Sequence, residues 1–157
     1  MWERLFGLTN LVALVGWALL LLGPRRWLPL ARYGAVGLLC AAYVCLLVGL
    51  IAGWIDPGRD GPAPPFEYTV AGLRAMFASD GAVVVGWTHY LTFDLFVGCW
   101  IAERASAGRV SRWLQAPVLL LTFLAGPAGL LAAFALLSGE KRRRGAHREG
   151  ADRVGQG

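Results

Sequence analysis

The stretch that decides the fold is "WTHYLTFDLFVGCW", residues 87–100. It is apolar almost throughout, yet it carries His89 and, five residues later, Asp94. An ionised carboxylate near the middle of a membrane-spanning helix costs at least about 2.5–3.5 kcal/mol on insertion scales. If this stretch crosses a membrane, both side chains therefore need a polar partner or a function.

The rest of the chain has the composition of an integral membrane protein. Of its 157 residues, 57% are hydrophobic and 16% are charged, and the mean hydropathy is +0.54. Soluble domains carry about 25% charged residues. Four apolar runs, each near the roughly 20 residues that span a bilayer as a helix, are residues 5–22, 33–55, 82–102 and 117–137. We therefore predict an all-α fold, an integral membrane four-helix bundle.

The chain divides into two parts by composition. Residues 1–138 form the predicted four-span transmembrane domain, and residues 139–157 form a basic tail that begins with "KRRRGAHRE" at residues 141–149. Lys and Arg beside a membrane attract anionic headgroups at about 1 kcal/mol each. The tail is thus predicted to be disordered and to meet membrane lipids, with no nucleic acid as a partner.

The distribution of positive charge bears on orientation. With four spans, both termini lie on one side, which then holds nine Lys and Arg residues against six on the other. Cytoplasmic loops carry the excess of positive charge. The balance favours cytoplasmic termini, in a multi-pass protein of a bacterial cytoplasmic membrane.

The longest connection, residues 56–81, separates the second and third runs. It begins with "DPGRDGPAPP", whose prolines and glycines interrupt a helix. Phe66, Val70, Leu73, Met76 and Phe77 then recur at helical spacing. This pattern predicts a short amphipathic helix on the membrane surface between spans 2 and 3. A loop packed on the bundle is the alternative.

A helical wheel separates the polar residues of the third run into two stripes. At about 100° per residue, one stripe holds His89 with Phe93, Phe96 and Trp100. An aromatic wall with one proton-exchanging group suits a long conjugated or isoprenoid ligand. Packing in the core of a bundle is an equally good interpretation of such a stripe.

Asp94 belongs to the second stripe, about 140° from His89. It shares that stripe with Tyr90 and Gly98, and the four-residue spacing from Asp94 to Gly98 to Ala102 allows another helix to approach closely. Asn10, in the first run, is the most obvious candidate donor to Asp94, although a purely structural hydrogen bond between helices is the favoured interpretation of Asn10. A His/Asp dyad made by this helix alone is disfavoured.

Other kinds of site lack their sequence patterns. A single histidine in the membrane with scattered carboxylates has no metal-ligand spacing, and no nucleotide fingerprint or Ser/His/Asp arrangement is present. We predict neither a metal nor a cofactor. Any catalysis is then acid/base chemistry inside the membrane.

Three segments together resemble one family. "WTHYLTFDLFVGCWI", residues 87–101, is similar to the signature helix of the abscisic-acid-deficient-4-like proteins, whose usual form is near W-x-H-Y-L-x-F-D-L-F-V-G-R-W. "NLVALVGWALLLLGP", residues 10–24, and "PVLLLTFLAGPAGLL", residues 117–131, resemble the first and last helices of that family. Cys99 stands where the family commonly has arginine.

The resemblance implies a four-helix membrane protein related to plant neoxanthin synthase, which is associated with conversion of the epoxy-carotenoid violaxanthin into allenic neoxanthin. It implies site residues His89, Asp94 and Trp100 in the motif, with Asn10 facing them.

The function expected from residues and resemblance together is modification of a carotenoid or related polyene by an integral-membrane isomerase or similar enzyme. His89 is the candidate base or relay and Asp94 the candidate acid. The candidate substrate-binding residues are Asn10, Tyr90, Phe93, Phe96 and Trp100.

Two alternatives stay open at this point. One is a non-catalytic pigment or lipid carrier or assembly partner, in which His89 and Asp94 hold helices together. The other is a proton-coupled transporter, which four short spans with one intramembrane acid favour less unless the chain forms a homo-oligomer.

Overall fold

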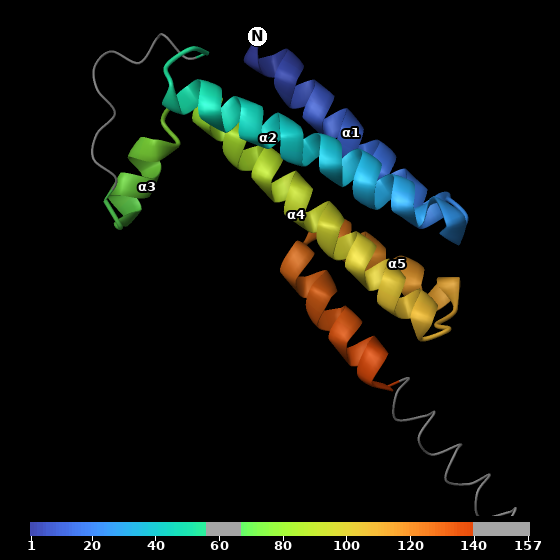
Figure 1. Ribbon diagram of the computed structural model, residues 1–157. Coiled ribbons are helices and arrows are strands. Elements are labelled where there is room, and N and C mark those ends of the chain that lie inside the picture. Colours follow the sequence, from blue (N-terminus) through green and yellow to red (C-terminus); the bar gives the residue numbers. More distant parts are fainter. Residues whose placement is uncertain (56–66, 140–157) are drawn as a thin grey trace, which may run out of the picture.

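The computed structural model describes residues 1–55 and 67–139, and in these residues the chain is helical without any strand. Figure 1 shows long helices packed side by side along most of their length. The predicted all-α fold is therefore confirmed. The predicted disordered tail after Gly139, the "DPGRDGPAPP" stretch and Phe66 lie outside the described residues.

Three helices are long and apolar enough to cross a membrane. They are α1 (Trp2–Leu22), the continuous helical segment Arg25–Ile51, and α4 (Asp80–Ala107). The middle one is built from a 3-10 turn η1 (Arg25–Trp27), a π-helical turn η2 (Leu30–Ala35) and α2 (Val36–Ile51). These helices agree with the first three predicted spans.

α4 is the central helix of the three. Half of its most apolar window, 50%, is buried inside the protein, against 28% for α1 and 22% for Arg25–Ile51. The remaining apolar side chains of the outer two helices point outward, where lipid replaces protein as their neighbour. Side chains on α4 therefore meet the other helices on several faces.

The three spans alternate in direction. α1 and α4 run parallel, because Phe6 lies against Trp87 near the start of both helices, with ring centroids 5.8 Å apart, and Trp17 lies against Gly98 farther along. The second helical segment runs the opposite way, since Arg32, near its start, pairs with Glu103 near the end of α4, and Leu50, near its end, lines one cavity with Ala82 near the start of α4. Positions equally far from the starts of α1 and α4 therefore lie at similar depth in the membrane.

The fourth apolar run is not among the helices long enough to cross a membrane, so the described residues hold three candidate spans where four were predicted. It consists of two short helices, α5 (Arg112–Leu124) and Gly126–Gly139, separated by a break at Ala125. Pro127 has no N–H to continue the hydrogen-bond ladder of α5. The helix is therefore interrupted completely at the Gly-Pro pair, residues 126–127.

The chain reverses direction at this break. α5 starts beside the end of α4, where Gln115 and Ser106 line the same pocket, and reaches the middle of α4, where Gly126 lies against Asp94. The second helix then returns along α4, because Phe134 meets Trp100 with ring centroids 5.9 Å apart. We call α5 and Gly126–Gly139 together the re-entrant hairpin.

The re-entrant hairpin changes which charges share an end of the molecule. Gly139 lies at the end where α1 finishes and α5 begins, which we call the arginine end. Six arginines lie in the connections at this end, and six further Lys and Arg residues follow Gly139, making twelve of the fifteen in the chain. The opposite end has Arg4, Arg59 and Arg74.

The predicted helix between spans 2 and 3 is present as α3 (Val70–Met76). The Thr69 hydroxyl caps its start by accepting a hydrogen bond from the Gly72 N–H at 2.9 Å. α3 lies at the end of the bundle opposite the arginine end (Figure 1). Phe77, directly after it, packs onto Gly86 of α4 so closely that a Cβ at Gly86 would overlap its ring.

Candidate functional site

The first half of the candidate site surrounds His89, which α4 directs toward α2. Its ring lies 5.4 Å from that of Tyr43 and 4.6 Å from that of Phe93, measured between centroids. The stacking with Phe93 follows from their spacing of four residues, which places both side chains on one helical face. The predicted stripe of His89 and Phe93 is thus present.

A cavity of about 330 Å³ opens beside His89 between α2, α3 and α4. Its wall is apolar except for the polar atoms of His89 and Tyr43, and Met76 and Phe77 close it from the side of α3. Such a cavity accepts an apolar group and offers it a proton donor or acceptor at one point. Tyr43 could not be found by sequence reasoning, because nothing in its apolar run distinguishes it.

The aromatic stripe continues from this cavity along the outside of α4. Phe93 and Phe96 are 56% and 42% exposed, so no helix among the described residues covers them. At the far end of the stripe, Trp100 packs edge-on against Phe134 of the re-entrant hairpin. The stripe therefore faces lipid over most of its length and is not the packed core of a bundle.

Asp94 faces away from this stripe, toward the tip of the re-entrant hairpin. Its carboxylate lies so close to Gly126 that a Cβ there would overlap Oδ1. Gly126 is the first residue of the returning helix, and the N-terminus of a helix carries partial positive charge. This arrangement explains how a carboxylate is accommodated at that depth.

One oxygen of Asp94 has no hydrogen-bond partner. Tyr90 lies one turn earlier on the same stripe, near the carboxylate. Oδ2, however, is buried and makes no hydrogen bond with any described residue. A buried carboxylate oxygen in this state is available to a proton or to a polar group of a ligand.

Asn10 does not meet Asp94, and this expectation was wrong. Its Nδ2 donates to the Phe6 carbonyl at 2.7 Å, and its Oδ1 accepts from the indole Nε1 of Trp87 at 3.2 Å. Trp87 in turn stacks on Tyr90 with centroids 5.4 Å apart. Asn10 therefore lies at the level of Trp87, two turns before Asp94, and is linked to the Asp94 stripe through aromatic rings.

His89 and Asp94 are not brought together. His89 faces Tyr43 and the cavity, whereas Asp94 faces Gly126 and Tyr90. This matches the angle predicted between them. The Gly-Pro pair at 126–127 is the sequence feature that marks the Asp94 site, because Gly126 at the break in the helix lies against the carboxylate.

Cys99 is buried, and a cation lies near it on another helix. Arg32 of η2 pairs with Glu103, one turn after Cys99, with 2.5 Å between Nη1 and Oε1. The guanidinium of Arg32 also lies 6.0 Å from the centroid of the Phe96 ring. The second span thus brings an arginine to the region where the family motif commonly has its own.

Within residues 1–55 and 67–139, no group of three His, Cys, Asp or Glu side chains is placed to hold a metal ion. No curated protein and no solved structure matches the chain. The profile of the ABA DEFICIENT 4-like family matches residues 4–132, which include most of α1, all of α4 and α5, and the break that faces Asp94. The chain therefore belongs to the ABA DEFICIENT 4-like family.

Proposed function

We propose that this protein is a polyene-modifying enzyme of a bacterial cytoplasmic membrane, which isomerises a carotenoid or a related isoprenoid. The polyene lies along the aromatic stripe of α4, and one end of it enters the cavity beside His89. Its substrate-binding residues are Tyr90, Phe93, Phe96 and Trp100, with Asn10 holding Trp87 in place. Family membership supports this substrate class, since the family is associated with neoxanthin synthesis.

The observation that carries the proposal is the continuity of the stripe with the cavity. Phe93 follows His89 on one face of α4, with their rings 4.6 Å apart, and Phe93 and Phe96 are both exposed in part. A rigid, elongated apolar ligand finds flat polarizable surface there without displacing a helix. A lipid acyl chain gains less from aromatic faces than a conjugated chain does.

The proposed chemistry is a proton transfer from carbon to oxygen. His89 takes a proton from a carbon atom of the end group in the cavity, and an acid protonates the oxygen of the adjacent epoxide as its C–O bond breaks. The substrate and the product are isomers, so no oxidant or reductant takes part. Asp94 is the proposed source of this proton. It faces another side of α4 and does not line the cavity, so the proton reaches the epoxide by way of water or a hydroxyl group. The Oδ2 of Asp94, unpartnered among the described residues, supports that role.

The rival function is a pigment or lipid carrier without catalysis. It is favoured by the separation of His89 and Asp94, which face different neighbours. In that case Asp94 anchors the tip of the re-entrant hairpin and His89 only lines the cavity. The two functions differ in whether the bound polyene changes chemically.

The test is expression of the full chain in a bacterial host that accumulates epoxy-carotenoids, with pigments analysed by chromatography and mass spectrometry. We expect a new isomer, and a loss of at least about 100-fold in its rate of formation in His89→Ala and Asp94→Asn. Leu38→Ala is the matched control, because Leu38 faces outward on α2 and lies away from the cavity. Each variant is compared at equal amounts of monodisperse protein in detergent.

Three outcomes separate the hypotheses. A new isomer that disappears in both variants but not in Leu38→Ala supports the enzyme. Unaltered pigment that copurifies with all variants identifies a carrier. Normal product formation in Asp94→Asn with loss in His89→Ala keeps the enzyme but refutes Asp94 as its acid.

A further inference from the structure

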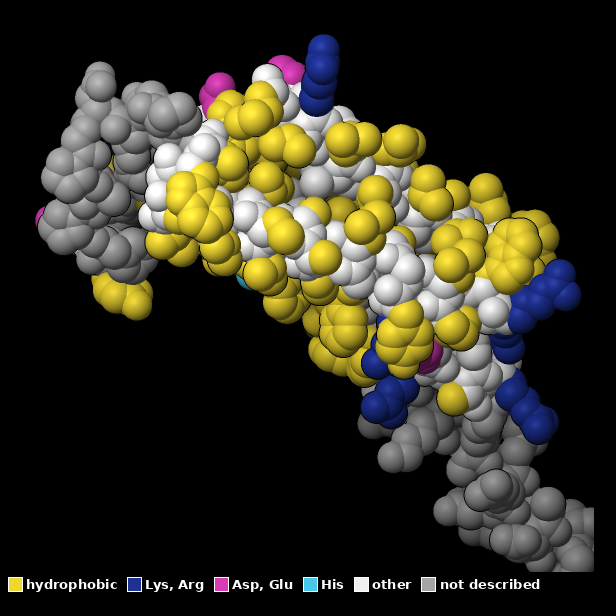
Figure 2. All heavy atoms as spheres, turned by 45° about the horizontal axis from the view of Figure 1, so that its top comes forward, with side chains coloured by type: hydrophobic (Ala, Val, Ile, Leu, Met, Phe, Trp, Pro, Cys, Tyr) yellow, Lys and Arg dark blue, Asp and Glu magenta, His cyan; other side chains and the backbone are white. Residues whose placement is uncertain are grey.

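The arginine end of the molecule carries a strong excess of positive charge. Among described residues, its connections hold a single acid, Glu103, and six arginines, which are Arg25, Arg26, Arg32, Arg104, Arg109 and Arg112. Glu103 is paired with Arg32. Figure 2 shows basic side chains gathered at this end, beyond the apolar surface that covers the helices. The other five guanidinium groups form no ion pair within the described part of the chain.

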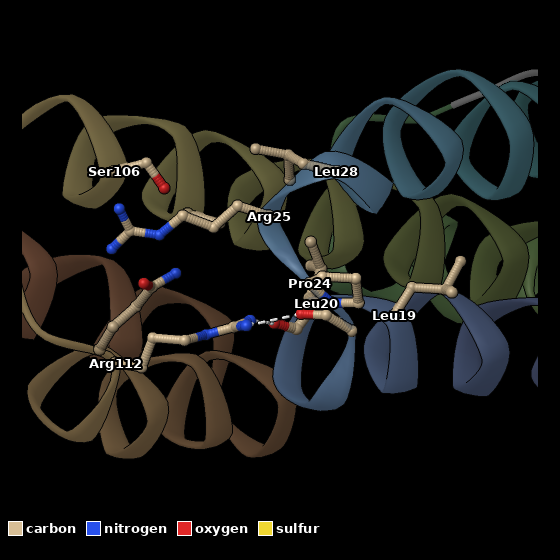
Figure 3. A pocket seen from close by; sticks show the side chains of 10 residues that line it. Leu19, Leu20, Pro24, Arg25, Leu28, Ser106 and Arg112 are labelled. Atoms are coloured by element: carbon tan, nitrogen blue, oxygen red, sulfur yellow. Dashed lines mark hydrogen bonds between the residues drawn. The ribbon is translucent and has the colours of Figure 1, made fainter.

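Two of these arginines line one pocket between the end of α1, the end of α4 and the start of α5. Figure 3 shows Arg25 and Arg112 reaching into it from different elements, with Ser106 close to the Arg25 guanidinium. No carboxylate is among the residues that line the pocket, and its other walls include Leu19 and Leu28. The pocket is thus positively charged and partly apolar.

Both arginines are held in place by backbone carbonyls. Arg112 donates to the Gly23 carbonyl at 2.6 Å and to the Leu20 carbonyl at 3.1 Å, and Arg25 donates to the Val110 carbonyl at 3.0 Å. A guanidinium has five N–H donors, so each arginine keeps further donors. A backbone carbonyl does not neutralise the positive charge of a guanidinium group, whereas a bound anion does.

The inner wall of the pocket presents an acceptor without a donor. Gln115 is buried, only 4% exposed, and its Oε1 makes no hydrogen bond with the residues that the structure describes. The pocket has about 10 Å³ of space for water-sized groups, which is enough for a hydroxyl group or one water molecule. A larger anion must therefore stay at the mouth, between the guanidinium groups.

We propose that this pocket binds the headgroup of an anionic phospholipid that bears a hydroxyl group, such as phosphatidylglycerol. The phosphate lies at the mouth between Arg25 and Arg112, and a headgroup hydroxyl donates to Oε1 of Gln115. The pocket lies where spanning helices end, which is the depth of phospholipid headgroups. Leu19 and Leu28 meet the start of the acyl chains.

The proposal is tested by native mass spectrometry of the full chain, delipidated in detergent and titrated with phosphatidylglycerol or phosphatidylcholine. We expect phosphatidylglycerol to be retained in preference, and Arg25→Gln to weaken its binding about tenfold or more, as removal of a charged hydrogen bond does. Arg26→Gln is the matched control, since it removes the same charge from the adjacent position outside the pocket. We expect it to change binding less than about threefold.

A second variant tests the inner wall without altering charge. Gln115→Leu removes the acceptor, and we expect it to reduce the preference for phosphatidylglycerol over phosphatidic acid, whose headgroup has no alcohol. A circular dichroism spectrum like that of the unmodified chain establishes that the variant folds.

Two results overturn the proposal. If Arg26→Gln weakens binding as much as Arg25→Gln, the attraction is diffuse and the pocket is not a lipid site. If millimolar inorganic phosphate displaces the lipid completely, the pocket is a site for free phosphate instead. Neither result depends on polyene chemistry, so this proposal and the proposed function fail independently.

Discussion

Replacement of Gly98 by alanine tests the packing at the centre of the protein. A Cβ at this position would lie 2.6 Å from Cη2 and 2.8 Å from Cζ3 of Trp17. Carbon atoms in contact are about 3.5–4.0 Å apart, so the indole ring must move by about 1 Å. Trp17 is 3% exposed and packs edge-on against Phe123, with ring centroids 5.4 Å apart. The ring therefore has no free space to move into.

We expect Gly98→Ala to lower the free energy of unfolding by about 1–3 kcal/mol, the usual cost of overpacking a buried site. Gly37→Ala is the control, because no heavy atom lies within 4 Å of its added Cβ. A helical Gly→Ala change without a clash stabilises by roughly 0.5–1 kcal/mol. The two alanine variants should thus shift stability in opposite directions.

The assay is equilibrium unfolding of the purified chain in mixed micelles with increasing dodecyl sulfate, followed by circular dichroism. In a Trp17→Phe background, where the ring is smaller, Gly98→Ala should cost less than it does alone. Equal stability of Gly98→Ala and Gly37→Ala, or an equal cost in both backgrounds, would refute the close approach of α1 and α4 at Gly98.

Two further predictions follow from the fold. With twelve of fifteen Lys and Arg residues at or beyond the arginine end, the positive-inside rule predicts an external N-terminus and a cytoplasmic C-terminus. The test uses a chain without its native cysteines and with one cysteine added either before Met1 or after Gly157. A membrane-impermeant maleimide on intact cells should label the first cysteine but not the second. Labelling of both or neither would support four spans. The hydrogen bond from Trp87 to Asn10 should show a coupling of about 0.6 kcal/mol in a double-mutant cycle of Trp87→Phe and Asn10→Ala, whereas additive losses would mean that the bond does not form.

Much of the fold follows from hydropathy and helical spacing. The third run had a length and composition that leave a spanning helix as the natural outcome, and the angle between His89 and Asp94 is fixed by helical geometry alone. Both predictions agree with the structure. The parallel direction of α1 and α4 also follows from the sequence, because one helix that crosses the membrane lies between them along the chain.

The level of Asn10 could have been predicted by counting. Asn10 is eight residues after the start of α1 at Trp2, and Trp87 is seven residues after the start of α4 at Asp80. Parallel helices that start at the same membrane surface bring such positions together. Asp94 is fourteen residues into α4, too deep for Asn10 to reach.

The re-entrant hairpin could not be predicted from hydropathy. The apolar run at residues 117–137 has the same length and composition whether it crosses the bilayer or turns back within it. The structure adds the close approach of Gly126, at the break, to the Asp94 carboxylate on a different helix. That contact joins residues 94 and 126. Hydropathy averaged along the chain carries no information about contacts between residues so far apart in the sequence.

The re-entrant hairpin makes the protein unequal in its two leaflets. α5 and the returning helix have 13 and 14 residues, so each is about 20 Å long and shorter than the roughly 30 Å hydrocarbon core of a bilayer. Near the arginine end, five helices of the described chain pass through the leaflet, and near α3 only the three spans do. The protein is therefore wedge-shaped, with its broad side at the arginine end. A wedge-shaped protein in a bilayer deforms the lipid around it, and the elastic energy of that deformation depends on the curvature of the membrane.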